Sequence, residues 1–166
     1  MTTHIAGTRP PLDTPHRWHA LMEFVQDDPA QSSPGELAMH LLEQAINENL
    51  LGNATIASSD TQAEAFWKIR DTIAEAERAA GPALQHDISV PVAAMARFIE
   101  DEAPPIEAAY PGTKTLAFGH LGDGNIHFHV LAAKGVNGPA WQDGEGKAIS
   151  RMVNDLVTDW GGSISA

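Results

Sequence analysis

The feature that most constrains the fold is a glycine-rich turn between two short apolar segments. Residues 118–130 read FGHLGDGNIHFHV, with three glycines inside six positions. Glycine allows the backbone to turn sharply, and a connection this short can join two strands only as an antiparallel hairpin. We therefore expect strands over Thr115–Gly119 and Ile126–Ala132.

The remaining segments predict strands that alternate with helices. Strands are expected at 17–26, 53–59 and 86–90, and helices at 34–50, 61–80, 91–103 and 149–160. Ser33 and Glu36 form a capping box around the first helix start, and Pro104-Pro105 are expected to end the third helix. Alternation alone would favour a parallel doubly wound fold. Because of the hairpin, we expect instead an α+β fold with a mixed or antiparallel sheet and helices packed mainly on one face.

The bulk composition indicates one ordinary globular domain. The chain has 166 residues, 43% hydrophobic and 19% charged, which is enough to bury a core without covalent staples. Cysteine is absent. Any metal site must therefore use nitrogen and oxygen ligands.

The charge is strongly acidic, with 10 basic against 22 acidic side chains and a formal net charge of −12. Nucleic acids and anionic membranes are bound by clustered Lys and Arg, so we expect neither as a partner. One small anionic substrate, which needs only one or two local cations, is still allowed. The first residues lack an apolar signal segment and no stretch is long enough to span a bilayer, so a cytoplasmic location without membrane insertion is expected.

The hairpin also concentrates histidines. Residues two apart on a strand share a face, so Asn125, His127 and His129 point the same way, and the hairpin brings His120 next to His127. Two neutral imidazoles suit Zn, Mn, Fe or Ni, although a catalytic metal needs a third ligand and an open position. The spacing alone fits ordinary structural histidines better, and Asp123 fits a turn cap as well as a ligand contact.

Four segments together resemble one known family. GHLGDGNIHFHV is similar to the signature G-H-x-G-D-G-N-x-H of the FAD-linked oxidase C-terminal domain. This domain is the substrate cap of flavoenzymes of the vanillyl-alcohol-oxidase type, including D-lactate, D-2-hydroxyglutarate and glycolate dehydrogenases. AFWKIRDTIAEA (65–76) resembles the family's W-x-x-R-E stretch, HDISVPV (86–92) its D-x-S-x-P segment, and WGGSISA (160–166) the stretch before its E-H-G-I-G motif.

The resemblance implies a domain organisation. Residues 1–16 would be an irregular lead-in, and residues 17–166 a partial, ferredoxin-like cap domain that stops before the E-H-G-I-G motif. No FAD-binding domain is expected in these residues. The expected partners are an FAD-binding domain or subunit and a small 2-hydroxyacid, and a homodimer is a further expectation.

The resemblance also implies residue roles. His120 and His127 would be two of three ligands of a divalent metal, Zn or Mn, the third being a glutamate that directly follows the G-G-x-I-S-A stretch. Arg70 would hold the substrate carboxylate, since a guanidinium pairs bidentately with carboxylates. Asn125 would contact the cofactor.

Three substrate-side positions depart from the family pattern. The 2-hydroxyglutarate enzymes have Thr and Lys where this chain has Ala74 and Gln85, and the family often has Asn at the position of His129. A second, distal carboxylate would therefore be poorly held, although His129 can still donate a hydrogen bond and can titrate.

The function expected from the resemblance is the cap portion of an FAD-dependent D-2-hydroxyacid dehydrogenase. The metal and cap side chains would orient the 2-hydroxyacid while its C2 hydride passes to FAD. Without a flavin domain, this chain is expected to be inactive by itself. The alternative is a free-standing metal- or small-acid-binding α+β module without catalysis, with a purely structural variant in which the histidines are buried.

Overall fold

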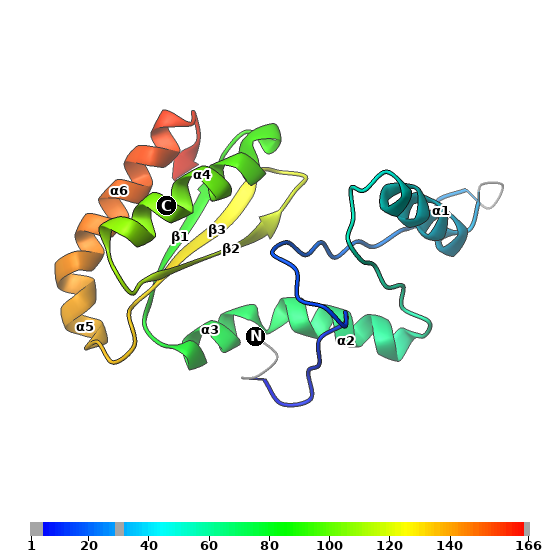
Figure 1. Cartoon of the computed structure of the whole chain (residues 1–166), viewed down its shortest axis with the longest axis horizontal. Coiled ribbons are helices and arrows are strands. Elements are labelled where there is room, and N and C mark those ends of the chain that lie inside the picture. Colours follow the sequence, from blue (N-terminus) through cyan, green and yellow to red (C-terminus); the bar gives the residue numbers. More distant parts are fainter. Residues whose placement is uncertain (1–4, 29–31, 165–166) are drawn as a thin grey trace. The chain divides into compact units, whose positions relative to one another are not determined.

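The computed structural model describes residues 5–28 and 32–164 (Figure 1). The chain divides into two compact units, Met1–Ala76 and Glu77–Ala166. Each unit is described by itself below.

The second unit is built on a four-stranded sheet within the described residues. Its strands are β1 (Ala83–Ser89), β2 (Lys114–His120), β3 (Asn125–Leu131) and β4 (Ser163–Ile164). Their order is β2-β3-β1-β4, and every neighbouring pair is antiparallel. With α4 (Met95–Ala109) after β1 and α6 (Lys147–Asp159) after β3, the chain order is β-α-β-β-α-β, which is the ferredoxin-like arrangement. The predicted α+β class, the hairpin and the antiparallel sheet are confirmed.

Helices α4 and α6 cover one face of this sheet (Figure 1). Alternate strand residues point into the layer between sheet and helices, where Ile88, Ile126, Phe128 and Val130 are at most 1% exposed. The helices bury Phe98, Ile106, Ile149, Val153 and Val157 against them. This explains the apolar stripe that predicted the last helix. The connections add η1 (Val92–Ala94), α5 (Gly138–Trp141) and η2 (Gln142–Gly146).

Helix α4 does not end where Pro104-Pro105 led us to expect. It continues to Ala109 with both prolines inside it. Both are exposed, so water can reach the carbonyl groups that lose a hydrogen-bond partner. The next residue, Ile106, is fully buried. Burial of such a side chain is worth roughly 1.5–3 kcal/mol, which offsets much of the cost of proline in a helix.

The first unit contains α1 (Pro34–Asn47) and α2 (Asp60–Asp71), while α3 (Ile73–Ala80) crosses the boundary between the units. The capping box of Ser33 and Glu36 is present. The helix stops before the predicted Leu50, because Asn49 adopts a φ of 60°.

Two strands predicted for the first unit are not formed. Residues 17–26 and 53–59 form no strand. A strand is stable only when a neighbour satisfies its backbone groups, and the sheet pairs only β1–β4 among the described residues. Several of the apolar side chains that suggested the first strand are exposed, namely Trp18, Leu21, Met22 and Val25.

The helix predicted over 61–80 is divided in two at Thr72. The Thr72 hydroxyl donates to the Lys68 carbonyl over 2.7 Å, a back-bond that competes with regular helical bonding. Within the described residues, no helix is both long and apolar enough to cross a bilayer.

Candidate metal site

The face of the sheet opposite α4 and α6 carries the polar and histidine residues. The strand register places them in three cross-strand rungs: Ser89–Asn125–His120, Asp87–His127–Phe118 and Gln85–His129–Leu116. Four of the predicted site residues, namely His120, Asn125, His127 and His129, are therefore neighbours on one surface, with Gln85 beside them. We call these rungs the histidine face.

The turn of the hairpin requires glycine at position 124. Gly124 has a φ of 77°, and a Cβ added there would lie 2.4 Å from the Val90 carbonyl oxygen. Asp123 accepts a hydrogen bond from the Asn125 N–H at 2.9 Å, so it serves as a turn cap. The hairpin therefore holds the ends of β2 and β3 in a defined register.

His120 and His127 lie near the turn of this hairpin, where β2 ends and β3 begins. Their ring centroids are 6.2 Å apart, and the rings are nearly perpendicular at 74°. Two imidazoles on one tetrahedral zinc, with Zn–N bonds near 2 Å, have centroids roughly 5 Å apart. A ring approach of about 1 Å, within the range of side-chain rotation on an exposed strand end, would let both bind one ion.

Asp87 orients the His127 ring. The carboxylate Oδ1 pairs with His127 Nδ1, and Asp87 is exposed while His127 is half-buried. A histidine that directs Nδ1–H at a carboxylate presents the lone pair of Nε2, which is the common arrangement of a metal-bound histidine. Sequence reasoning gave Asp87 no role, although its place in the D-x-S-x-P segment and on the histidine face was a usable signal.

His129 is held differently. It is 5% exposed, and its Nδ1 pairs with Oε2 of Glu77, itself only 3% exposed. The other carboxylate oxygen of Glu77 accepts from Gln85 Nε2 at 2.8 Å. No local pattern in the sequence indicates the role of Glu77, because its partners lie eight and fifty-two residues away.

Asp87, His127 and His129 form a second geometric candidate for a metal site, with one possible ligand atom from each within 4.8 Å of the others. Nδ1 of each histidine already faces a carboxylate. His129 is buried, whereas His120 is exposed at the strand end. An ion arriving from solvent therefore reaches the His120–His127 pair more easily than the His127–His129 pair.

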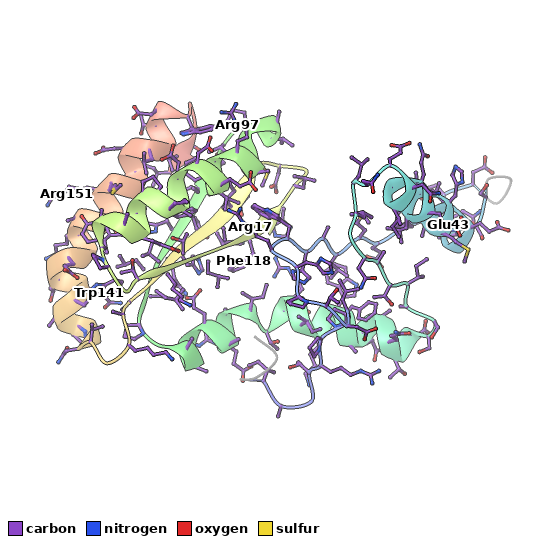
Figure 2. The ribbon with its side chains drawn as sticks, in the orientation of Figure 1. Arg17, Glu43, Arg97, Phe118, Trp141 and Arg151 are labelled. Atoms are coloured by element: carbon purple, nitrogen blue, oxygen red, sulfur yellow. The ribbon has the colours of Figure 1, made fainter. Side chains whose placement is uncertain are left out.

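Phe118 stabilises the two inner histidine rings. Its ring centroid lies 4.7 Å from that of His127 and 5.3 Å from that of His129, the second contact edge-to-face. Figure 2 shows this side chain on the histidine face of the sheet. Such contacts limit ring rotation and help to keep the two histidines in fixed orientations.

Arg70 and Ala74 belong to the first unit and are not part of the rungs of the second. Arg70 lies half-buried in the last turn of α2, and Ala74 lies in the first turn of α3. His86 lies on the other side of β1, where its ring contacts the Phe128 carbonyl and the Ser150 hydroxyl, each at 3.0 Å. Burial lowers its pKa from the ordinary 6.5.

Comparison with known proteins identifies the family. Residues 2–166 match the family described as FAD linked oxidases, C-terminal domain. The chain belongs to this family. The resemblance seen in the four sequence segments is thereby confirmed.

Several relatives of this FAD-linked oxidase domain carry curated names. The D-2-hydroxyglutarate dehydrogenase of Xanthomonas citri pv. viticola is 33% identical over 125 residues, which cover 75% of this chain and 26% of that protein. The mitochondrial D-2-hydroxyglutarate dehydrogenase of Arabidopsis thaliana is 29% identical over 163 residues, 98% of this chain and 27% of that protein. A putative mitochondrial D-lactate dehydrogenase of Schizosaccharomyces pombe is 23% identical over 170 residues, 97% of this chain and 31% of that protein. The chain therefore spans about a quarter to a third of the length of these relatives.

Proposed function

We propose that this FAD-linked oxidase domain is the metal-holding, substrate-side part of an FAD-dependent D-2-hydroxyacid dehydrogenase. One observation carries the proposal. Asp87 aligns His127 so that its Nε2 is available on the same hairpin end as His120, whose ring lies 6.2 Å away. The names of the relatives indicate the same class of reaction.

The donor set fits a divalent metal with a preference for nitrogen and oxygen ligands, such as Zn or Mn. His120 and His127 would be its ligands, and Asp87 would keep His127 in the metal-binding tautomer. The third ligand implied by the resemblance follows the stretch WGGSISA. Part of that stretch, β4, lies against β1, with the Ser163 and Ser89 hydroxyl oxygens 2.8 Å apart. Ser163 is thus in register with the rung of Ser89, Asn125 and His120, and the family's third ligand would follow this strand on the same sheet.

A metal in this place would polarise the hydroxyl and carboxylate oxygens of a bound 2-hydroxyacid, and FAD, bound mainly by another domain or subunit, would supply the redox chemistry. The residues of this chain would orient the substrate. Arg70 would pair with its carboxylate, while His129, Gln85 and Ala74 would border its remaining substituent. Asn125 would contact the cofactor.

The test is a calorimetric zinc titration of the purified chain. We expect one zinc per chain, with binding weakened at least tenfold by His120→Asn and by His127→Asn, since each removes one of two ligands. His40→Asn removes an exposed histidine on α1 and should leave binding unchanged.

The variant His129→Asn separates the two geometric candidates. Unchanged affinity in this variant supports the His120–His127 site. Affinity lost on His129→Asn and retained on His120→Asn would assign the ion to Asp87, His127 and His129 instead. Absence of zinc and manganese binding at millimolar concentration would overturn the metal site altogether.

A further inference from the structure

The histidine face ends at a buried acid, Glu77. Its side chain comes from α3 and is 3% exposed, which is unusual for a glutamate. A carboxylate is costly to bury unless its oxygens are hydrogen-bonded. Here Oε1 accepts from Gln85 Nε2 at 2.8 Å and Oε2 pairs with His129 Nδ1. Glu77 is therefore built into the structure rather than placed there by chance.

The acid lies one rung beyond the proposed metal site. Gln85 and His129 are a cross-strand pair, and Asp87 and His127 are the next pair on the same face. Two residues along a strand span about 7 Å, so the Glu77 network stands at that distance from the rung of His127. This is the reach of a four- or five-carbon acid whose hydroxyl end is held at His127.

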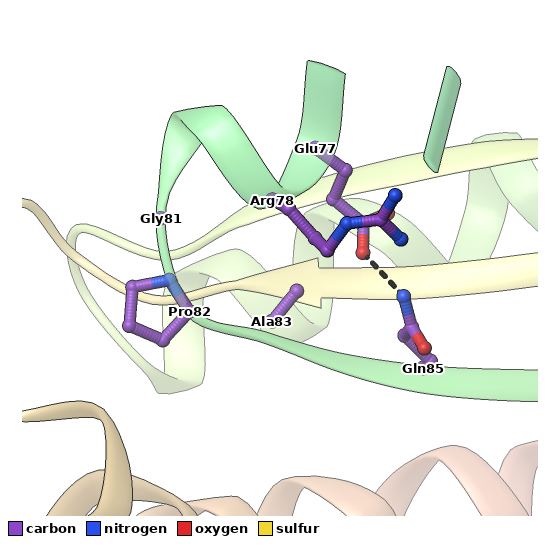
Figure 3. A pocket seen from close by; sticks show the side chains of 6 residues that line it. All are labelled: Glu77, Arg78, Gly81, Pro82, Ala83 and Gln85. Carbon is purple, nitrogen blue, oxygen red and sulfur yellow. Dashed lines mark hydrogen bonds between the residues drawn. The ribbon is translucent and has the colours of Figure 1, made fainter. Parts of the chain in front are cut away.

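A hollow on the surface borders this network. It has a volume of 540 Å³ and is lined by Glu77, Arg78, Gly81, Pro82, Ala83 and Gln85. Figure 3 shows Glu77 and Gln85 joined by their hydrogen bond at its wall. A substituent that extends from the histidine face toward this hollow meets Gln85 and Glu77. The nearest donors, Gln85 Nε2 and His129 Nδ1, are already paired with the carboxylate of Glu77.

We propose that Glu77 is a specificity-determining residue that makes the site select 2-hydroxyacids with an uncharged remaining substituent and disfavour those with a second carboxylate. The inference rests on the proposed function, since it needs a 2-hydroxyacid anchored at the histidine face. Arg78 is the one cation in the lining of this hollow. It is exposed and therefore screened by water, whereas the charge of buried Glu77 is screened less.

The test compares two acids on the zinc-loaded chain. D-lactate and D-2-hydroxyglutarate are titrated into ¹⁵N-labelled protein, and dissociation constants are taken from the amide shifts of the histidine-face residues. We expect D-lactate to bind more tightly. In Glu77→Gln, the ratio of the two dissociation constants should move in favour of the dicarboxylate by roughly fivefold to tenfold, as expected when a like charge beside the second carboxylate is removed in a partly solvated site.

Two further variants keep the test decisive. Glu75→Gln removes an exposed acid from the same helix and should leave the ratio unchanged. Gln85→Lys adds a cation at an exposed position next to Glu77 and should shift the ratio in the same direction as Glu77→Gln, even if Glu77→Gln does not fold.

The outcomes separate the two proposals. The wild type, Glu77→Gln and Gln85→Lys can all bind zinc and D-lactate with the same ratio of the dissociation constants for the two acids. That result would overturn the role of Glu77 and leave the proposed function standing. Tighter binding of D-2-hydroxyglutarate than of D-lactate by the wild type would also overturn it. Failure of the wild type to bind zinc, or to bind either acid when zinc-loaded, would overturn the proposed function and this inference with it.

Discussion

Replacing Gly124 by alanine should break the turn that brings the two histidine-bearing strand ends together. Gly124 has a φ of 77°, and an added Cβ would lie 2.4 Å from the Val90 carbonyl oxygen. The left-handed conformation costs an alanine roughly 1–2 kcal/mol, and overpacking against a backbone atom typically costs about 1–3 kcal/mol. Together they predict a loss of about 2–5 kcal/mol in the free energy of unfolding.

Gly122 offers the matched control in the same turn. A Cβ there meets nothing within 4 Å, and its φ is not in the left-handed region, so Gly122→Ala should change stability by no more than about 0.5 kcal/mol. Urea unfolding followed by circular dichroism measures both variants. Equal effects of the two substitutions, or a Gly124→Ala protein as stable as the wild type, would refute the assigned turn geometry.

Three further predictions concern single side chains. Asp87→Asn should weaken zinc binding about 10- to 100-fold by removing the charge that orients His127, whereas Asp101→Asn on α4 should not; equal affinities in calorimetry would contradict the orienting role. Burial lowers the pKa of His86, so below pH ~6.5 the unfolded chain binds a proton that the folded chain does not. The free energy of unfolding therefore decreases as the pH is lowered. His86→Asn should flatten this dependence between pH 7.5 and 5, and an unchanged slope in urea unfolding would exclude His86 as its source. Ile149→Ala, at a fully buried position, should cost about 2–5 kcal/mol, against little for Ile46→Ala, whose side chain is 43% exposed; similar losses would contradict the packing of α6.

The sequence predicted the second unit well because its signals are local. The glycine turn dictates a hairpin, and the stripe of Ile149, Val153 and Val157 dictates a helix with one buried side. The strand alternation of residues 125–129 placed His127 and His129 on the same face. These features depend on neighbours within a few residues, which the sequence displays directly.

The predictions were wrong where contacts between residues far apart in the sequence determine the structure. Residues 17–26 have the composition of a strand, but a strand also needs a partner edge, and none lies beside them in the described sheet. Pro104-Pro105 resemble a helix stop, yet burial of Ile106 carries α4 past them. Glu77 was missed for the same reason, since a buried acid is revealed only by the residues that fold against it.

The central claim is that His120 and His127 bind a divalent metal, with the Asp87 carboxylate paired to Nδ1 of His127. A crystal structure of the zinc-loaded chain, with anomalous data collected at the zinc edge, tests it most directly. We predict one anomalous peak at 2.0–2.1 Å from a ring nitrogen of both histidines, with Asp87 still paired to Nδ1 of His127. A peak bound by Asp87 or His129 without His120, or no peak on the histidine face, would contradict the claim.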